Sequence, residues 1–188
     1  MWRIQHDSGK TRDSCCEQYK ARNRDLNPLS LADVKVDASS FSGNALEPGA
    51  YMIQSAAWPY LMLGLRDGVE KEGNPVDTIL ALQGVGPKWN FKAKHAGSTT
   101  FTIQSQGGYF QRVEKISDNE GVVGSATATV FNIVQPLKEH PGLYSIQVGD
   151  GKFAVQAVSG SGADQVVLQP FNERDTRQLW VFLGGLQD

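Results

Sequence analysis

One four-residue pattern, aromatic-x-Ile-Gln, occurs three times and limits the possible folds more than any other feature of the chain. The copies are Tyr51-Met52-Ile53-Gln54, Phe101-Thr102-Ile103-Gln104 and Tyr144-Ser145-Ile146-Gln147, spaced 50 and then 43 residues apart. Spacings of about 20 to 50 residues are typical of structural repeats. Within each copy the aromatic residue and the isoleucine recur at period two, as in a half-buried strand. The chain is therefore predicted to contain three similar β units.

Each unit carries further strand and turn signals. Gln106-Gly107-Gly108 and Gly149-Asp150-Gly151 follow the first strand of repeats two and three as hairpin turns. Each unit ends in an aromatic-x-apolar triplet: Trp89-Asn90-Phe91, Phe131-Asn132-Ile133 and Trp180-Val181-Phe182. The spacing predicts four short strands per unit. A β-propeller typically needs four or more blades, whereas three four-stranded units close as a β-trefoil. We predict an all-β, pseudo-threefold β-trefoil over residues 46–185, a barrel with a hairpin cap, and place the repeated aromatic and isoleucine residues at its centre.

Residues 1–45 differ from the repeats in composition. Residues 10–24 mix both charge signs with little hydrophobic periodicity, and residues 39–44 read as a linker. This composition predicts a flexible or partly helical extension, with a short helix near residues 29–36 and Ser30 as its N-cap. Cys15 and Cys16 precede the first repeat and cannot staple the repeats together. Disulfide geometry disfavours a bond between adjacent cysteines, and no function is assigned to them.

Charge and hydropathy exclude several kinds of partner. The 188 residues include 18 Lys and Arg against 20 Asp and Glu, a net charge of −2. This balance argues against binding nucleic acid or an anionic membrane through a basic face. The apolar run at residues 60–63 is far shorter than the about 20 residues that span a bilayer. Residues 1–7 contain no apolar signal-peptide core, so we expect a cytoplasmic protein.

No catalytic constellation stands out. His6, His95 and His140 are scattered, without the clustered spacing of a metal site. The Gly-x-Ser-x-Gly elbow of the α/β-hydrolases is absent from the sequence. Residues 149–152 (Gly-Asp-Gly-Lys) fit a hairpin turn better than a phosphate loop, because the upstream glycine spacing is missing. We therefore expect a protein that is not an enzyme and that uses neither a cofactor nor a metal.

Residues 46–184 resemble the fungal β-trefoil serine protease inhibitors, the mycospin-like inhibitors of mushrooms. The matching segments are residues 46–53, 121–125, 141–146, 166–170 and 178–182. The resemblance implies a protein inhibitor of trypsin-like serine proteases that acts through an exposed, substrate-like loop. A rigid loop loses little entropy on binding, and a basic side chain can fill the acidic specificity pocket of such a protease.

The inhibitory loop implied by this resemblance lies between the second and third strands of repeat one, at residues 66–77. Its implied protease-binding residues are Arg66, Asp67, Gly68, Lys71 and Asn74, with Arg66 and Lys71 as specificity candidates. A solvated charged loop without a partner is the alternative. The implied partner is a serine protease.

A second resemblance, to the ricin-B-type lectins, implies carbohydrate binding as the alternative function. Gln178-Leu179-Trp180 matches the Gln-x-Trp that ends each lectin repeat, while the equivalent positions before Trp89 and Phe131 lack the glutamine. The lectins place an Asp near the first hairpin of a repeat, and Asp150 would be that residue. Trp58 and Tyr60 lie in the first connection of repeat one, where they could stack on a sugar or fold back over the barrel end. A third possibility is a trefoil scaffold with neither activity.

Overall fold

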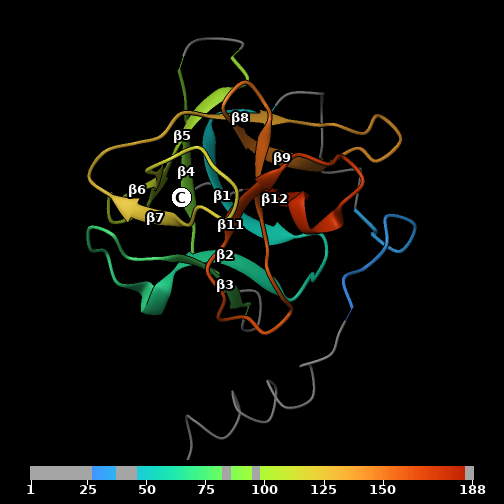
Figure 1. Cartoon of the computed structure of the whole chain (residues 1–188), viewed down its shortest axis with the longest axis horizontal. Coiled ribbons are helices and arrows are strands. Elements are labelled where there is room, and N and C mark those ends of the chain that lie inside the picture. The colour runs from blue at the N-terminus through green and yellow to red at the C-terminus, as the bar shows by residue number, and fades with distance from the viewer. Residues whose placement is uncertain (1–26, 37–45, 82–85, 95–97, 185–188) are drawn as a thin grey trace, which may run out of the picture.

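The structure, a computed structural model, describes residues 27–36, 46–81, 86–94 and 98–184 (Figure 1). Its strands are β1 (Gly49–Ser55), β2 (Leu61–Leu65), β3 (Val76–Leu80), β4 (Trp89–Ala93), β5 (Thr100–Ser105), β6 (Phe110–Val113), β7 (Val122–Ser125), β8 (Phe131–Val134), β9 (Leu143–Val148), β10 (Phe153–Gln156), β11 (Val167–Pro170) and β12 (Trp180–Gly184). Two short 3₁₀ turns, η2 (Arg66–Gly68) and η3 (Thr176–Gln178), follow β2 and precede β12. No helix in the described part of the chain is long and apolar enough to cross a membrane.

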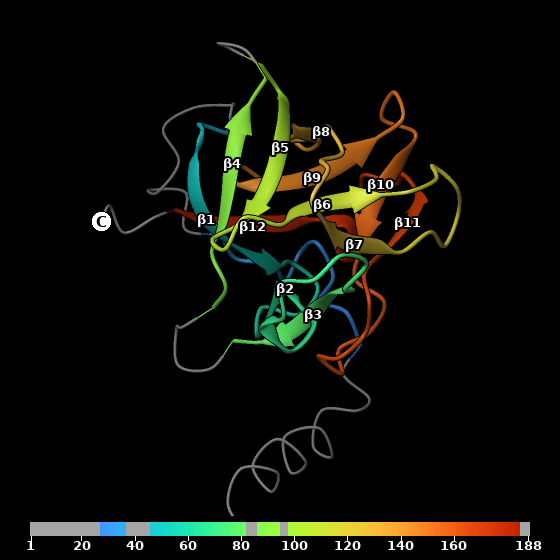
Figure 2. The same ribbon diagram turned by 90° about the vertical axis from the view of Figure 1, so that its left-hand side faces the viewer.

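The first and fourth strands of the three repeats close a barrel. Antiparallel pairing runs β1–β4–β5–β8–β9–β12 and returns from β12 to β1. The second and third strands form the hairpins β2–β3, β6–β7 and β10–β11. In Figure 2 the β2–β3 hairpin lies below the upright barrel strands β4 and β5. This is the predicted β-trefoil, and the prediction of fold class is confirmed.

The repeated isoleucines and two of the three repeated aromatics, Phe101 and Tyr144, are buried in the barrel as predicted, whereas Tyr51 is partly buried and packs against the core. Ile53, Ile103 and Ile146 are all fully buried, as are the large aromatic residues that begin the fourth strands. The indole nitrogen of Trp89 donates to the Leu63 carbonyl at 3.0 Å, and that of Trp180 donates to the Val155 carbonyl at 3.1 Å. The barrel can bury these two polar groups because each has a hydrogen-bond partner.

The recurring glutamines of the pattern serve the barrel. Gln54 Nε2 donates to the Pro59 carbonyl, and Gln104 Nε2 donates to the Gly108 carbonyl at 2.7 Å. Both bonds hold the connection that follows the first strand of the repeat. Gln147 instead bonds Ser145 Oγ at 2.7 Å. These side chains are therefore occupied by contacts within their own repeats.

The described part of the N-terminal extension, residues 27–36, is docked on the barrel. The Leu29 amide donates to the Ala57 carbonyl at 3.0 Å, and Thr176 Oγ1 donates to the Leu29 carbonyl at 2.7 Å. Leu31, Val34 and Val36 pack on a second apolar cluster, formed by Ala56, Leu137, Leu143, Leu179 and Val181. The segment contains a turn at residues 31–33 rather than the expected helix. The apolar side chains and backbone groups of this described part find partners on the barrel, and the flexibility of the extension as a whole stays a prediction. Cys15 and Cys16 lie outside the described residues.

The loop between the second and third strands of each repeat contacts the first connection of the next repeat. The contacting pairs are Glu70 with Gly107, Ile116 with Gly149, and Gly160 with Tyr60. The three junctions are equivalent in position and differ in chemistry. Because the barrel is pseudo-symmetric, comparison of the repeats shows which positions are specialised.

Candidate ligand site

The loop at residues 66–77 is the protease-binding candidate, and its first basic residue is already paired. Arg66 makes a bidentate contact with Asp77, at 2.7 Å from Nε and 3.1 Å from Nη2. The hydrogen bond that Arg66 donates to Asp77 raises the pKa of Arg66. Asn74 Nδ2 donates to the carbonyls of Arg66 and Val69, and Asp67 and Gly68 form a left-handed turn with φ of 55° and 66°. Arg66 and Asn74 therefore shape the loop, and the Arg66 side chain is 45% exposed while paired.

Two glutamates anchor the middle of the same loop to repeat two. Glu70 Oε1 accepts hydrogen bonds from Ser105 Oγ and from the Gly107 amide, both at 2.8 Å. Glu72 accepts from Ser125 Oγ and from the Ala126 amide, both at 2.7 Å. These bonds lower the pKa of Glu72.

Lys71 lies between the two anchors and is exposed. No described residue forms an ion pair or hydrogen bond with its ammonium group. Among the implied protease-binding residues, Lys71 is therefore the one basic side chain left available.

The sequence allowed Trp58 and Tyr60 either to stack on a sugar or to fold back over the barrel end, and in the structure they fold back. Trp58 is 4% exposed and belongs to the main core cluster. Tyr60 donates its hydroxyl to the Gly160 carbonyl at 3.1 Å. A Cβ on Gly160 would lie 2.8 Å from both Trp58 Nε1 and the Tyr60 hydroxyl, so the loop that contains Gly160 lies directly on these rings. Trp58 consequently offers no open face for a sugar.

Asp150 lies in the exposed turn between β9 and β10, with φ of 59°. Its carboxylate makes no hydrogen bond or ion pair with any described residue. The structure does not place it beside Trp58 or Tyr60, which belong to repeat one. The role of Asp150 in ligand binding stays a prediction.

Strand pairing identifies one equivalent position on the second strand of each repeat. Gln54 pairs with Met62, Gln104 with Phe110 and Gln147 with Ala154. Two residues beyond each partner stand Gly64, Arg112 and Gln156. These three residues occupy the same place in the trefoil and differ completely in chemistry.

In repeat one this position is closed by apolar side chains. A Cβ on Gly64 would lie 2.5 Å from Ile79 Cδ1 and 3.1 Å from Pro87 Cγ. A Cβ on the neighbouring Gly86 would lie 2.3 Å from Met62 Sδ. The position therefore presents no polar side chain and no room for one.

In repeat two the position is occupied from repeat one. Arg112 Nη1 lies 3.7 Å from Glu72 Oε1 and 3.4 Å from Ser125 Oγ. Ser125 in turn donates to the same Glu72 carboxylate. Glu72 in the anchored loop of repeat one thus forms an ion pair with Arg112 of repeat two.

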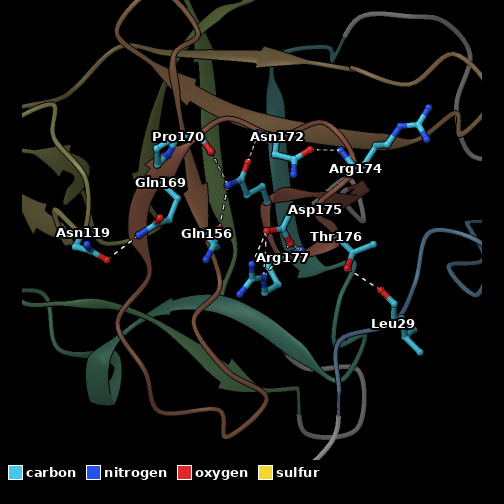
Figure 3. A network of polar contacts seen from close by, with 11 residues as sticks. Leu29, Asn119, Gln156, Gln169, Pro170, Asn172, Arg174, Asp175, Thr176 and Arg177 are labelled. Carbon is cyan, nitrogen blue, oxygen red and sulfur yellow. Dashed lines mark hydrogen bonds and ion pairs between the residues drawn. The ribbon is translucent and has the colours of Figure 1, made fainter.

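In repeat three the position is occupied by a glutamine that a second glutamine holds in place. Gln178 Nε2 donates to Gln156 Oε1 and to the Pro170 carbonyl, both at 3.0 Å, while Gln178 Oε1 accepts from the Asn172 amide at 2.8 Å. Gln178 therefore fixes the orientation of the Gln156 amide. No described residue accepts a hydrogen bond from Gln156 Nε2. Figure 3 shows Gln156 next to Arg177 in this network.

Asp175 and Arg177 complete the candidate site, which we call the repeat-three site (Gln156, Asp175 and Arg177). Arg177 donates from Nε to Asp175 Oδ1 at 2.9 Å and from Nη2 to Oδ2 at 2.6 Å, and its backbone amide donates to Oδ1 at 3.0 Å. Burial raises the pKa of Asp175, but the bonds from Arg177 outweigh it and hold this pKa below its ordinary value. The same pairing raises the pKa of Arg177. The Arg177 side chain is 41% exposed, so its guanidinium is oriented yet accessible.

Comparison with known proteins finds the same fold in several solved structures. No protein-family model and no curated protein sequence matches the chain. The Rhizoctonia solani agglutinin is similar with a TM-score of 0.65 and 23% identity, over 77% of this chain and 100% of that one. The Macrolepiota procera ricin B-like lectin in complex with lactose has a TM-score of 0.61 and 16% identity, over 76% of this chain and 100% of the lectin. This chain therefore shares the β-trefoil fold with a ricin B-like lectin.

A designed threefold-symmetric protein, ThreeFoil, is similar too, with a TM-score of 0.63 and 16% identity over 73% of this chain and 99% of that one. These identities establish the β-trefoil fold alone. The resemblances to ricin-B-type lectins and to mycospin-like inhibitors therefore stay predictions beyond this shared fold.

The sequence did not single out Gln156, Asp175 or Arg177. The signal that could have found them is Gln178-Leu179-Trp180, the one Gln-x-Trp match in the chain. Arg177 directly precedes it, and Gln156 is the residue that its glutamine orients. Within the described ranges, no group of three His, Cys, Asp or Glu side chains is placed to hold a metal ion.

Proposed function

We propose that this β-trefoil domain binds carbohydrate, and that the repeat-three site is where it does so. The observation that carries the proposal is the Gln156 amide nitrogen, from which no described residue accepts a hydrogen bond, next to the oriented and accessible Arg177 guanidinium (Figure 3). At the equivalent positions, Gly64 of repeat one is covered by Ile79 and Pro87, and Arg112 of repeat two is paired with Glu72. The fold shared with a lectin in complex with lactose supports the same reading.

The chemistry of the site suits a saccharide. Sugars present closely spaced oxygen atoms, which planar amide and guanidinium groups can engage with several directed hydrogen bonds. Gln178 already fixes Gln156, and Asp175 already fixes Arg177. Little side-chain entropy is therefore lost when a ligand binds.

A glycan array followed by calorimetric titration of the full chain tests the proposal. We expect Gln156→Met, which removes the amide, to weaken the binding of an array-positive glycan at least tenfold. Gln169→Met is the matched control, because Gln169 is a surface glutamine of the adjacent strand whose amide bonds Asn119 at 2.7 Å. Binding stoichiometry should be about one glycan per chain. An array without reproducible binding, or affinity unchanged by Gln156→Met, would contradict the proposal.

A second candidate function, inhibition of a trypsin-like protease, is favoured by the two anchored glutamates. Their bonds turn both carboxylates toward repeat two and hold Lys71 between them in a restrained loop. Titration of trypsin with wild-type protein and Lys71→Ala tests this candidate. Lys115→Ala is the control, since Lys115 is an exposed lysine in the corresponding loop of repeat two. Inhibition should disappear only with Lys71→Ala. Inhibition that survives this substitution would exclude the loop.

A further inference from the structure

We propose that the repeat-three site selects an acidic saccharide, whose carboxylate is bound by Arg177 and Gln156. This inference rests on the proposed function and narrows it to a ligand class. It follows from the hydrogen-bonding capacity that remains at the site after the internal bonds have formed.

The acceptors of the site are mostly used. Four donor contacts from Arg177 meet the two oxygens of Asp175, at distances between 2.6 and 3.2 Å. A carboxylate offers about four lone-pair sites, so this one is close to saturated. Gln156 Oε1 already accepts from Gln178. Asn172 Oδ1 accepts from the Arg174 amide at 3.1 Å.

The donors of the site are largely unused. Arg177 directs Nε and Nη2 toward Asp175, which leaves the second edge of the guanidinium, Nη1 with the outer Nη2 hydrogen. No described residue accepts from Nη1 or from Gln156 Nε2. The repeat-three site therefore presents N–H groups to a ligand and has few acceptors to offer in return.

This imbalance favours a carboxylate over a sugar hydroxyl. A carboxylate only accepts hydrogen bonds, and it matches the planar edge of a guanidinium through two parallel bonds. A hydroxyl also carries a proton that needs an acceptor, and a donor left without a partner in a contact is costly. Because Asp175 offsets the charge of Arg177, the preference should depend more on short hydrogen bonds than on long-range attraction. Only a modest dependence on salt is expected.

Matched ligand pairs test the inference on the full chain. One pair is an oligogalacturonate and its methyl ester, which differ only in the free carboxylates. The other is sialyllactose and lactose, which separates sialic acids from uronic acids as the source of the carboxylate. We expect one acid to bind at least tenfold more tightly than its neutral partner in calorimetry. Arg177→Lys, which keeps the charge and removes the planar edge, should abolish that preference.

The controls separate the two levels of the proposal. Arg174→Lys alters a neighbouring exposed arginine whose side chain points away from Gln156 in Figure 3, and it should leave the preference intact. Gln156→Met should reduce the preference without replacing a charged group, and thermal melting checks that each variant is folded. Neutral sugars that bind as well as the acids in a Gln156-dependent way would overturn the acidic ligand and leave carbohydrate binding standing. A chain that binds neither class would overturn both.

Discussion

Gln178 Nε2 donates to Gln156 Oε1 at 3.0 Å, a bond between two glutamines that are 2% and 8% exposed. Gln178 Nε2 also donates to the Pro170 carbonyl, and Gln178 Oε1 accepts from the Asn172 amide. The Gln156 oxygen is therefore held by Gln178, while no described residue accepts a hydrogen bond from its nitrogen. The buried glutamine of the Gln-x-Trp triplet thus orients an amide of the repeat-three site.

Replacing Gln178 should affect stability and binding together. Gln178→Leu leaves the Asn172 amide and the Pro170 carbonyl without their partner and frees the Gln156 amide to rotate. We expect unfolding in urea to become easier by about 1–3 kcal/mol and glycan affinity to fall. Gln169→Leu, on the exposed neighbouring strand, should change neither by a comparable amount. Unaltered glycan affinity in a folded Gln178→Leu protein would show that the orientation of Gln156 is unimportant.

Gln111 should lower the stability of the native barrel. It is fully buried, and neither its amide nitrogen nor its amide oxygen has a hydrogen-bond partner in the described structure. Register places it at the position of Leu63 and Val155, which are apolar and fully buried. Gln111→Leu removes an uncompensated polar group and should stabilise the protein by about 1–3 kcal/mol in chemical unfolding. The reciprocal substitution Leu63→Gln should destabilise it. A loss of stability in Gln111→Leu would mean that the amide has a partner in solution, such as a buried water.

Docking of residues 27–36 should be visible in hydrogen exchange. Leu31→Asp places a charge in the second apolar cluster, and the Leu29 amide that bonds Ala57 should then lose its protection. Ala32→Asp adds the same charge one residue along, at an exposed position, and should leave protection intact. Mass spectrometry of the peptide that contains Leu29 measures both. Equal exchange in the wild type and in Leu31→Asp would contradict the docking.

The Asp175–Arg177 pair should make stability depend on acid pH. The pKa of Asp175 in the folded protein is below its ordinary value of 3.8, so the unfolded chain binds the proton more readily. The contribution is fully present above the unfolded pKa and is lost as pH falls through the folded pKa. Asp175→Asn should therefore cost stability at pH 6, and its difference from the wild type should shrink toward pH 2. Thermal melts across this range provide the measurement, and a constant difference would argue against the pairing.

The sequence by itself determined the architecture. Three copies of aromatic-x-Ile-Gln, with an aromatic fourth-strand residue in each unit, require three equivalent strands around one apolar centre, and Ile53, Ile103 and Ile146 are buried there. Period-two burial and turn glycines are local properties, so they can be read without knowing which strands pair.

Only the tertiary structure decided which surface positions are open. Arg66 faces Asp77, the Glu70 and Glu72 carboxylates reach into repeat two, and Trp58 lies under the loop of Gly160. Each of these contacts joins two segments that come close only because of the course the loops take through space. The residue types in a loop do not determine that course. The orientation of the Gln156 amide depends likewise on Gln178, 22 residues further along the chain. Repetition thus predicts the scaffold, whereas the contacts between repeats determine where a ligand can bind.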